Sequence, residues 1–197
     1  MRKFNLALAA FAVCTATAAS AEKDWVLNGD QSVVSFGSVK ADNIGEAHTF
    51  SGLTGSVSAD GAAMVEIDLS TVNTNIDIRN ERIIEHVFKN APSAMLKAQI
   101  DMADFEGLGV GDSTVLEIEG DVALLGEDVP VYMDVFAMRL SEENVMVSTH
   151  SMMFVSTDEL GIDAGIDKLM ELASLPGITR SVPVTFRLMF SSGSTES

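Results

Sequence analysis

Beyond residue 25, apolar and polar residues alternate in short segments, which is the period of half-buried β-strands. The alternation is clearest in five segments: 33–38, 64–69, 97–102, 116–124 and 182–190. Two further segments are partly apolar on both faces and are also predicted as strands: 131–140 and 145–155. Turns rich in Gly, Asp and Asn separate these segments. Seven or eight antiparallel strands at such close spacing predict a β-sandwich or a closed barrel.

Two segments, 80–89 and 166–174, repeat their apolar residues at the helical period instead. The residues that share one helical face are Ile83, Ile84, Val87 and Phe88 in the first segment and Ile166, Leu169, Met170 and Ala173 in the second. No internal repeat, long linker or low-complexity run interrupts the chain. We therefore predict one domain over residues 22–193, followed by a polar tail at 194–197.

Residues 1–21 have the three parts of a cleavable signal peptide. Arg2 and Lys3 form a positively charged start, and residues 6–18 are uncharged and mostly apolar. Small residues then precede a cleavage site between Ala21 and Glu22. The apolar stretch is shorter than the roughly 20 residues that a membrane-spanning helix needs. We therefore expect a periplasmic mature chain without a stable membrane anchor.

The only cysteine, Cys14, lies inside this segment. Acylation of Cys14 in a lipoprotein is the alternative, but the bulky Val13 precedes it where Gly or Ala is wanted. Cleavage after Ala21 removes the thiol, so the mature chain is expected to have neither disulfides nor thiol chemistry. A domain of about 175 residues buries enough apolar surface to fold without them.

The chain is strongly acidic. It has 12 basic and 29 acidic residues, and the loss of Arg2 and Lys3 changes its net charge from −17 to −19. Such a surface repels nucleic acid and anionic membranes, and the simplest role of its charge is to keep the protein soluble. Apolar residues still make up 47% of the sequence, which indicates a folded chain with much apolar surface to bury.

Motifs for catalysis, cofactors and metals are missing from the sequence. His48, His86 and His150 are too far apart for a recognised metal-binding spacing. No Ser has an obvious His partner, and the glycines of 107–111 lead into a strand-like segment instead of the helix that a phosphate loop requires. We therefore predict no catalytic residue, no cofactor and no metal ligand.

Several segments, in this order along the chain, resemble the YceI-like family of periplasmic lipid-binding proteins. The most informative is 65–90, in which a strand leads through Val-Asn-Thr and Arg-Asn into a short helix that ends in Phe88. The other segments are similar to the opening strand, the Phe-to-Gly segment, a central hairpin and the closing strand of the family: 25–36, 50–57, 118–131 and 182–186. The resemblance covers residues 24 to 191.

This resemblance implies an all-β fold, namely an antiparallel lipocalin-like barrel of about eight strands with one or two short helices. It also implies a non-enzymatic carrier that holds a long apolar chain of the polyisoprenoid, quinone or fatty amide type inside the barrel. Burial of each methylene group contributes about 0.8 kcal/mol, so such a chain is held without many polar contacts. The residues predicted to face this ligand are Val34, Phe36, Phe50, Leu53, Ile67, Leu69, Ile100, Met102, Ile118, Val122, Phe154, Phe186 and Leu188.

The chain departs from the family pattern in two places that concern the ligand. His48 and Thr49 precede Phe50 where the family usually has a glycine. Between Gly161 and Pro183 the chain carries an insertion the length of a helix, near a loop end, where it is placed to narrow or cover the cavity.

Two other functions stay open at this point. A barrel with a solidly packed interior would instead serve as a protein-interaction module, through its acidic surface or its helices. A lipid-processing enzyme is the third hypothesis. An open, apolar tunnel through the barrel would favour the carrier, and the sequence is compatible with a homodimer.

Overall fold

The computed structural model describes residues 24–105 and 107–192, and eleven strands within these ranges pair into one antiparallel sheet. The strands are β1 (Trp25–Leu27), β2 (Val33–Lys40), β3 (Ile44–Phe50), β4 (Leu53–Val57), β5 (Ala62–Asp68), β6 (Ser93–Gln99), β7 (Ser113–Leu124), β8 (Glu127–Arg139), β9 (Asn144–Thr149), β10 (Met153–Ser156) and β11 (Ser181–Ser192). The helices are α1 (Asp77–Arg82) and α2 (Asp163–Ala173), with the π-helical turn η3 (Ile83–Val87) and the 3₁₀ turns η1 (Gly29–Gln31), η2 (Leu69–Thr71) and η4 (Met102–Phe105). The predicted signal peptide, its cleavage site at Ala21–Glu22 and the predicted polar tail lie outside the described residues.

Eight of the strands close into a barrel. They follow the order β1-β4-β5-β6-β7-β8-β9-β11, and β11 pairs again with β1 to complete the ring. Near this closure Phe190 of β11 lies opposite Val145 of β9 on one side and Leu27 of β1 on the other. Closure satisfies the backbone hydrogen bonds of strands that would otherwise be edges. The predicted antiparallel barrel is therefore confirmed, in preference to a sandwich.

The long strand β11 changes partners along its length. Its C-terminal half pairs with β9 and β1, whereas its N-terminal half pairs with β10 and β2. As a result the β2–β3 hairpin extends beyond the closed ring, and the only other backbone bridge of β3 within the described residues joins Thr49 and Asn73. The barrel is therefore closed at one end and splayed at the other.

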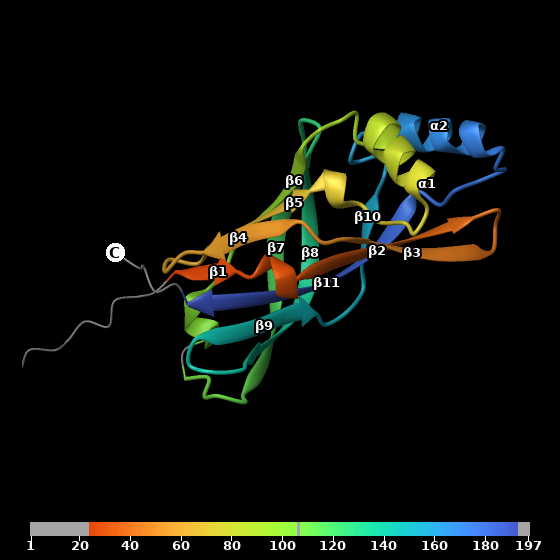
Figure 1. Cartoon of the computed structure of the whole chain (residues 1–197). Coiled ribbons are helices and arrows are strands. Elements are labelled where there is room, and N and C mark those ends of the chain that lie inside the picture. The colour runs from red at the N-terminus through yellow and green to blue at the C-terminus, as the bar shows by residue number, and fades with distance from the viewer. Residues whose placement is uncertain (1–23, 106, 193–197) are drawn as a thin grey trace, which may run out of the picture.

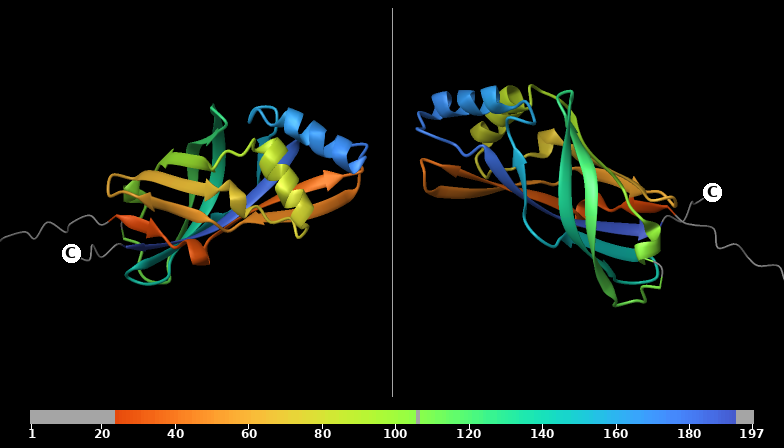
Figure 2. Two further views of the ribbon diagram at one scale, coloured as in Figure 1. Left: turned by 45° about the horizontal axis from the view of Figure 1, so that its top comes forward. Right: turned by 180° about the vertical axis from the view of Figure 1, so that it is seen from behind.

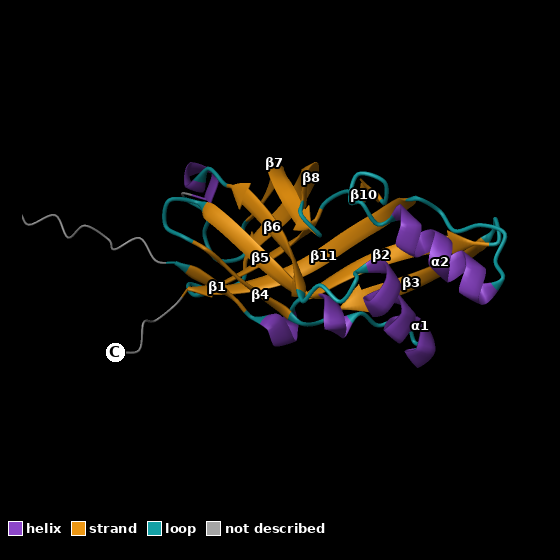
Figure 3. Ribbon diagram, turned by 90° about the horizontal axis from the view of Figure 1, so that it is seen from above, coloured by secondary structure: helices purple, strands orange, loops and turns teal. Residues whose placement is uncertain are grey.

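The helices gather at the splayed end. Figures 1 and 2 show α1 and α2 beside the β2–β3 hairpin, while β1 and the C-terminal end of β11 lie at the opposite end of the molecule. The view from above in Figure 3 shows the same elongated arrangement, with η4 at the end that carries β1. No helix in the described ranges is long and apolar enough to span a membrane.

A glycine allows α2 to approach η3 closely. A Cβ atom added to Gly165 of α2 would lie 2.4 Å from the carbonyl oxygen of His86 and 2.5 Å from the Cα of Val87. Both neighbouring atoms belong to the backbone, so no side-chain rotation would relieve the clash. Gly165 therefore determines how tightly α2 packs over the splayed end of the barrel.

The structure corrects three boundaries that the alternation predicted. Segment 145–155 forms two strands, because β9 pairs with both β8 and β11, whereas β10 continues along β11 alone after the break at 150–152. Segment 97–102 leaves the sheet after Gln99, where the Asp101 side chain accepts a hydrogen bond from the Ala103 amide and begins η4. The helix predicted at 80–89 begins earlier, at Asp77, and continues as the π-helical turn η3.

Candidate binding site: an apolar interior in two parts

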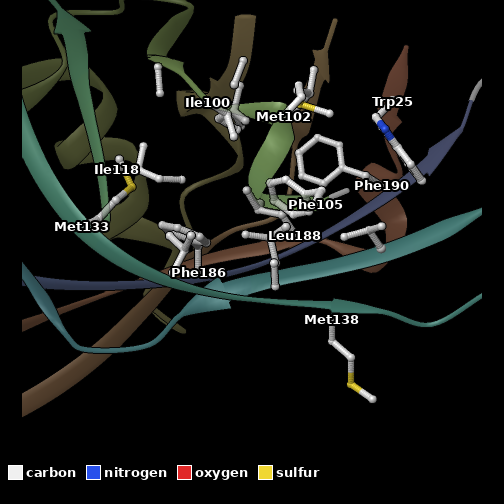
Figure 4. A pocket seen from close by; sticks show the side chains of 18 of the residues that line it. Trp25, Ile100, Met102, Phe105, Ile118, Met133, Met138, Phe186, Leu188 and Phe190 are labelled. Carbon is white, nitrogen blue, oxygen red and sulfur yellow. The ribbon is translucent and has the colours of Figure 1, made fainter. Parts of the chain in front are cut away.

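The first cavity lies within the closed part of the barrel and has a volume of about 430 Å³. Ile100 and Met102 lie on one side of this space, and Phe186 and Leu188 lie on the other (Figure 4). Its further apolar lining includes Trp25, Val65, Phe105, Leu108, Ile118, Met133, Val135, Val147 and Phe190. The charged lining residue Arg139 forms a 3.3 Å ion pair with Glu142. This cavity is suited to a hydrocarbon chain.

The second cavity, of about 510 Å³, lies at the splayed end, between the strands and the helices. Its apolar walls come from β2, β3 and β11, and its cover comes from α1, η3 and α2. Ile76 and Ile78 line it and are also 44% and 52% exposed, so the cavity opens to solvent beside them. We refer to this opening, beside Ile76 and Ile78, as the mouth.

The two cavities share Leu96 of β6 and Phe186 of β11 among their lining residues. We refer to these two residues as the junction. Because both cavities contact the same two side chains, the first cavity, towards the end that carries β1, adjoins the second, which lies beside α1. This geometry offers two adjoining apolar cavities, with the junction between them.

Most of the residues predicted to face a ligand line this interior. Those in the first cavity are Ile100, Met102, Ile118 and Leu188; those in the second are Val34, Phe36, Phe50, Ile67, Leu69 and Val122; and Phe186 lines both. Leu53 is only 3% exposed but lines neither cavity, because it is packed into the solid part of the core. Phe154, predicted to point inward, is 63% exposed, and its neighbours Met153 and Val155 line the second cavity instead.

The insertion between Gly161 and Pro183 forms the cover of the second cavity. It contains α2, whose Ile166, Leu169 and Ala173 line the cavity, as the predicted apolar face of this helix requires. Arg180 anchors the helix by donating to the carbonyl oxygen of Asp163 at 3.0 Å and to the carboxylate of Asp167. The insertion thus covers the cavity without filling it.

Polar side chains gather at the outer part of the second cavity. We refer to Ser38, Lys40, Glu46, His48, Arg79 and Arg82, all of which line it, as the mouth cluster. Glu46 accepts hydrogen bonds from Lys40 at 3.0 Å and from Arg79. Burial alone would raise the pKa of Glu46, but the hydrogen bonds and positive charges of Lys40 and Arg79 lower it below 4.5. Glu46 is therefore an anion at neutral pH.

His48 is the most buried member of the mouth cluster, at 4% exposure. Its ring packs against that of Phe36 with centroids 5.0 Å apart, and its Nε2 lies 3.1 Å from the Ser38 hydroxyl. Its Nδ1 has no hydrogen-bond partner within residues 24–105 and 107–192. Burial, reinforced by the positive charge of Arg79, lowers the pKa of His48 below 6.5. The imidazole is therefore neutral at neutral pH.

The buried His48 makes the stability of the protein depend on pH. Since the pKa of His48 is lower in the folded chain than its ordinary value of 6.5, the unfolded chain takes up a proton first. We therefore expect the free energy of unfolding to be highest above pH 6.5 and to fall as the pH decreases below it. Urea unfolding between about pH 7.5 and 5.5 measures this, in a range where Glu46 stays ionised.

Two variants test whether the pH dependence of stability comes from His48. His48→Gln is expected to flatten the pH dependence, whereas His150→Gln, a change at an exposed position, is expected to retain it. If the free energy of unfolding depends on pH equally in the wild type and in His48→Gln, His48 is not the source of the pH dependence.

The mouth cluster was not predicted from the sequence. The alternation that places Val34 and Phe36 inward continues to Ser38 and Lys40. This continuation was the sequence signal that these two polar side chains also face the cavity. Arg79 and Arg82 lie on α1, where a charged residue is ordinarily exposed, and only the packing of α1 against the hairpin brings them to the same cavity.

Comparison with known proteins relates this architecture to one group of structures. A polyisoprenoid binding domain from Saccharophagus degradans, implicated in plant cell wall breakdown, is 32% identical in sequence and superposes with a TM-score of 0.83. The match covers 86% of this chain and 98% of that domain. BcnA from Burkholderia cenocepacia is 17% identical, with a TM-score of 0.63 over 83% of this chain and 98% of its own, and so shares the fold. No family model and no curated protein sequence matches the chain.

Proposed function

The chain belongs to the YceI-like family, and from this membership and its open interior we propose that it is a non-enzymatic periplasmic carrier of a long-chain lipophilic ligand. The observation that carries the proposal is the pair of adjoining apolar cavities, of about 430 and 510 Å³, which share Leu96 and Phe186 in their linings. The ligand is a single apolar chain of the polyisoprenoid type that occupies both cavities. When the ligand leaves a membrane and enters such a barrel, the barrel shelters its apolar chain from water.

The energetics favour this use of the interior. Transfer of each methylene group from water to an apolar lining contributes about 0.8 kcal/mol, so a chain of many such groups is bound tightly without polar contacts. The lining is largely pre-formed by strands on all sides, which reduces the ordering cost of binding. A protein-interaction module would instead need a solidly packed core, and the two cavities argue against it.

Native mass spectrometry of the mature chain, purified from the periplasm of its own host, tests the proposal. We expect a bound species whose mass matches a long-chain lipid and which survives gentle ionisation. Adding a polyisoprenoid to delipidated protein is expected to raise its free energy of unfolding, by about 2.7 kcal/mol when the free ligand is at a hundred times its Kd.

The alternatives make different predictions in the same experiment. Absence of any bound lipid, together with no stabilisation by added polyisoprenoid, would refute the carrier. Chemical conversion of the added lipid, detected by chromatography after incubation, would support the enzyme instead. Recovery of the lipid unchanged is expected.

A further inference from the structure

The wall formed by the β2–β3 hairpin changes from apolar to charged along its length. Starting from Phe186 at the junction, the paired residues that line the second cavity are Val34 with Phe50, Phe36 with His48, Ser38 with Glu46, and finally Lys40. At about 3.3 Å per residue, the strand from Val34 to Lys40 spans about 20 Å. The apolar end faces the barrel interior and the charged end faces the mouth.

Two side-chain nitrogens of the mouth cluster lack hydrogen-bond partners among the described residues, although both are buried. These atoms are Nδ1 of His48 and Nε of Arg79. Arg79 uses its other two nitrogens for Glu46 and for the carbonyl oxygen of Thr74. A buried polar group without a partner destabilises a protein, so such groups call for an explanation. Both atoms are covered in this structure, so an oxygen atom of a bound ligand supplies the missing acceptor once the His48 or Arg79 side chain turns towards the cavity.

The charge of the mouth cluster is opposite to that of the protein. Lys40, Arg79 and Arg82 outnumber the single carboxylate of Glu46 in the lining of this cavity, whereas the whole chain has a net charge of −17. Arg82 is half-buried and forms no ion pair with any residue in the described ranges. An acidic protein that collects cations at one opening has a local preference for negatively charged groups there.

Building on the proposed carrier function, we propose that the mouth cluster binds an anionic, oxygen-bearing head group of an amphiphilic ligand, a phosphate or a carboxylate. The apolar chain of this ligand passes the junction and extends into the first cavity. Arg82 supplies the unneutralised positive charge, and Arg79 and His48 donate hydrogen bonds to the oxygens of the head group. The ligand thus has one orientation, with its head group at the mouth.

The first cavity offers a weaker polar site. Arg139 also has a buried Nε without a partner, but its charge is opposed by Glu142, and it is the only charged residue of that lining within the described ranges. The second cavity combines two unpartnered nitrogens with an excess of positive charge. We therefore assign the head group to the mouth cluster, and Arg139 is the competing position.

Competition binding with ligands that share a chain but differ in the head group tests the assignment. Geranylgeranyl phosphate and arachidic acid have anionic heads, and geranylgeraniol is the neutral match of the phosphate. We expect the wild type to bind the phosphate at least about tenfold more tightly than the alcohol, because hydrogen bonds to charged groups exceed those to neutral ones. This preference should weaken at high salt. The affinity of arachidic acid distinguishes a general anion site from one selective for phosphate.

Variants then locate the head group. Arg82→Gln is expected to reduce the affinity for geranylgeranyl phosphate about tenfold and to leave that for geranylgeraniol unchanged. Arg187→Gln, a change at an exposed position of β11 that lines neither cavity, should leave both unchanged, and Arg139→Gln should retain the preference for the phosphate over the alcohol. A loss of the preference in Arg139→Gln alone, or equal wild-type affinities for phosphate and alcohol, would overturn the assignment while leaving the carrier function intact. If none of these ligands binds, the carrier function fails as well.

Discussion

Replacing Leu96 by tryptophan is expected to lower the affinity for a long polyisoprenoid by about a hundredfold, with little effect on a short one. Leu96 lines both cavities and, with Phe186, lies between them. The larger indole ring would separate the cavities and exclude the end of a long chain from the first one. Loss of four buried methylene groups costs about 3 kcal/mol, which corresponds to a factor above one hundred.

The measurement is a comparison of chain lengths. Fluorescence competition with a short and a long prenyl alcohol gives the ratio of their Kd values for each variant. Val115→Trp, which places the same ring at a position that is 48% exposed on β7, is the control for the effect of an added indole. Equal loss of affinity for both chain lengths in Leu96→Trp would indicate a general packing defect, and no loss for the long chain would show that the ligand does not pass the junction.

Replacing Gly165 by valine is expected to destabilise the protein by about 2 kcal/mol and to release α2 from the second cavity. The added Cβ would lie within 2.5 Å of the backbone of His86 and Val87, and overpacking of this kind costs up to about 3 kcal/mol. Valine has a more favourable helix propensity than glycine, and this difference recovers less than about 1 kcal/mol of stability. The clash therefore outweighs the propensity gain.

Urea unfolding and hydrogen exchange measure these two effects separately. We expect the amides of α2 and η3 to lose protection at urea concentrations where the barrel strands are still protected. Gly45→Val is the matched control, since no atom lies within 4 Å of the Cβ position at Gly45 and the residue is exposed on β3. A Gly165→Val protein as stable as the wild type would contradict the close approach of α2 to η3.

The position of α2 also explains how an insertion serves a carrier. The helix contributes Ile166 and Leu169 to the wall of the second cavity and is tied to the barrel by Arg180. Weakening this cover should speed both uptake and release of the ligand, because the bound chain would no longer be enclosed on that side. The stopped-flow release rate of a fluorescent ligand from Gly165→Val gives this comparison directly.

Strand periodicity was a reliable guide wherever one face of a strand is polar. Phe186 and Leu188 alternate with polar neighbours, and both line the interior. The segment 145–155 is partly apolar on both faces, so its alternation does not identify the inward face. The structure selects the odd-numbered residues, such as Val147 and Val155, and leaves Phe154 exposed. A shift of one residue exchanges the two faces of a strand, and here only pairing with β11 decides between them.

What the sequence determined by itself is the set of local preferences: the strands, the two helical segments, the order of the family motifs and the apolar character of the interior. These follow from the spacing of neighbouring residues. Only the tertiary structure decided that the interior stays open, that Leu53 packs solidly while Leu96 lines two cavities, and that Arg82 reaches the same cavity as His48. Open volume and clustered charge depend on how distant segments pack together. The spacing of neighbouring residues does not show which distant segments will pack against each other.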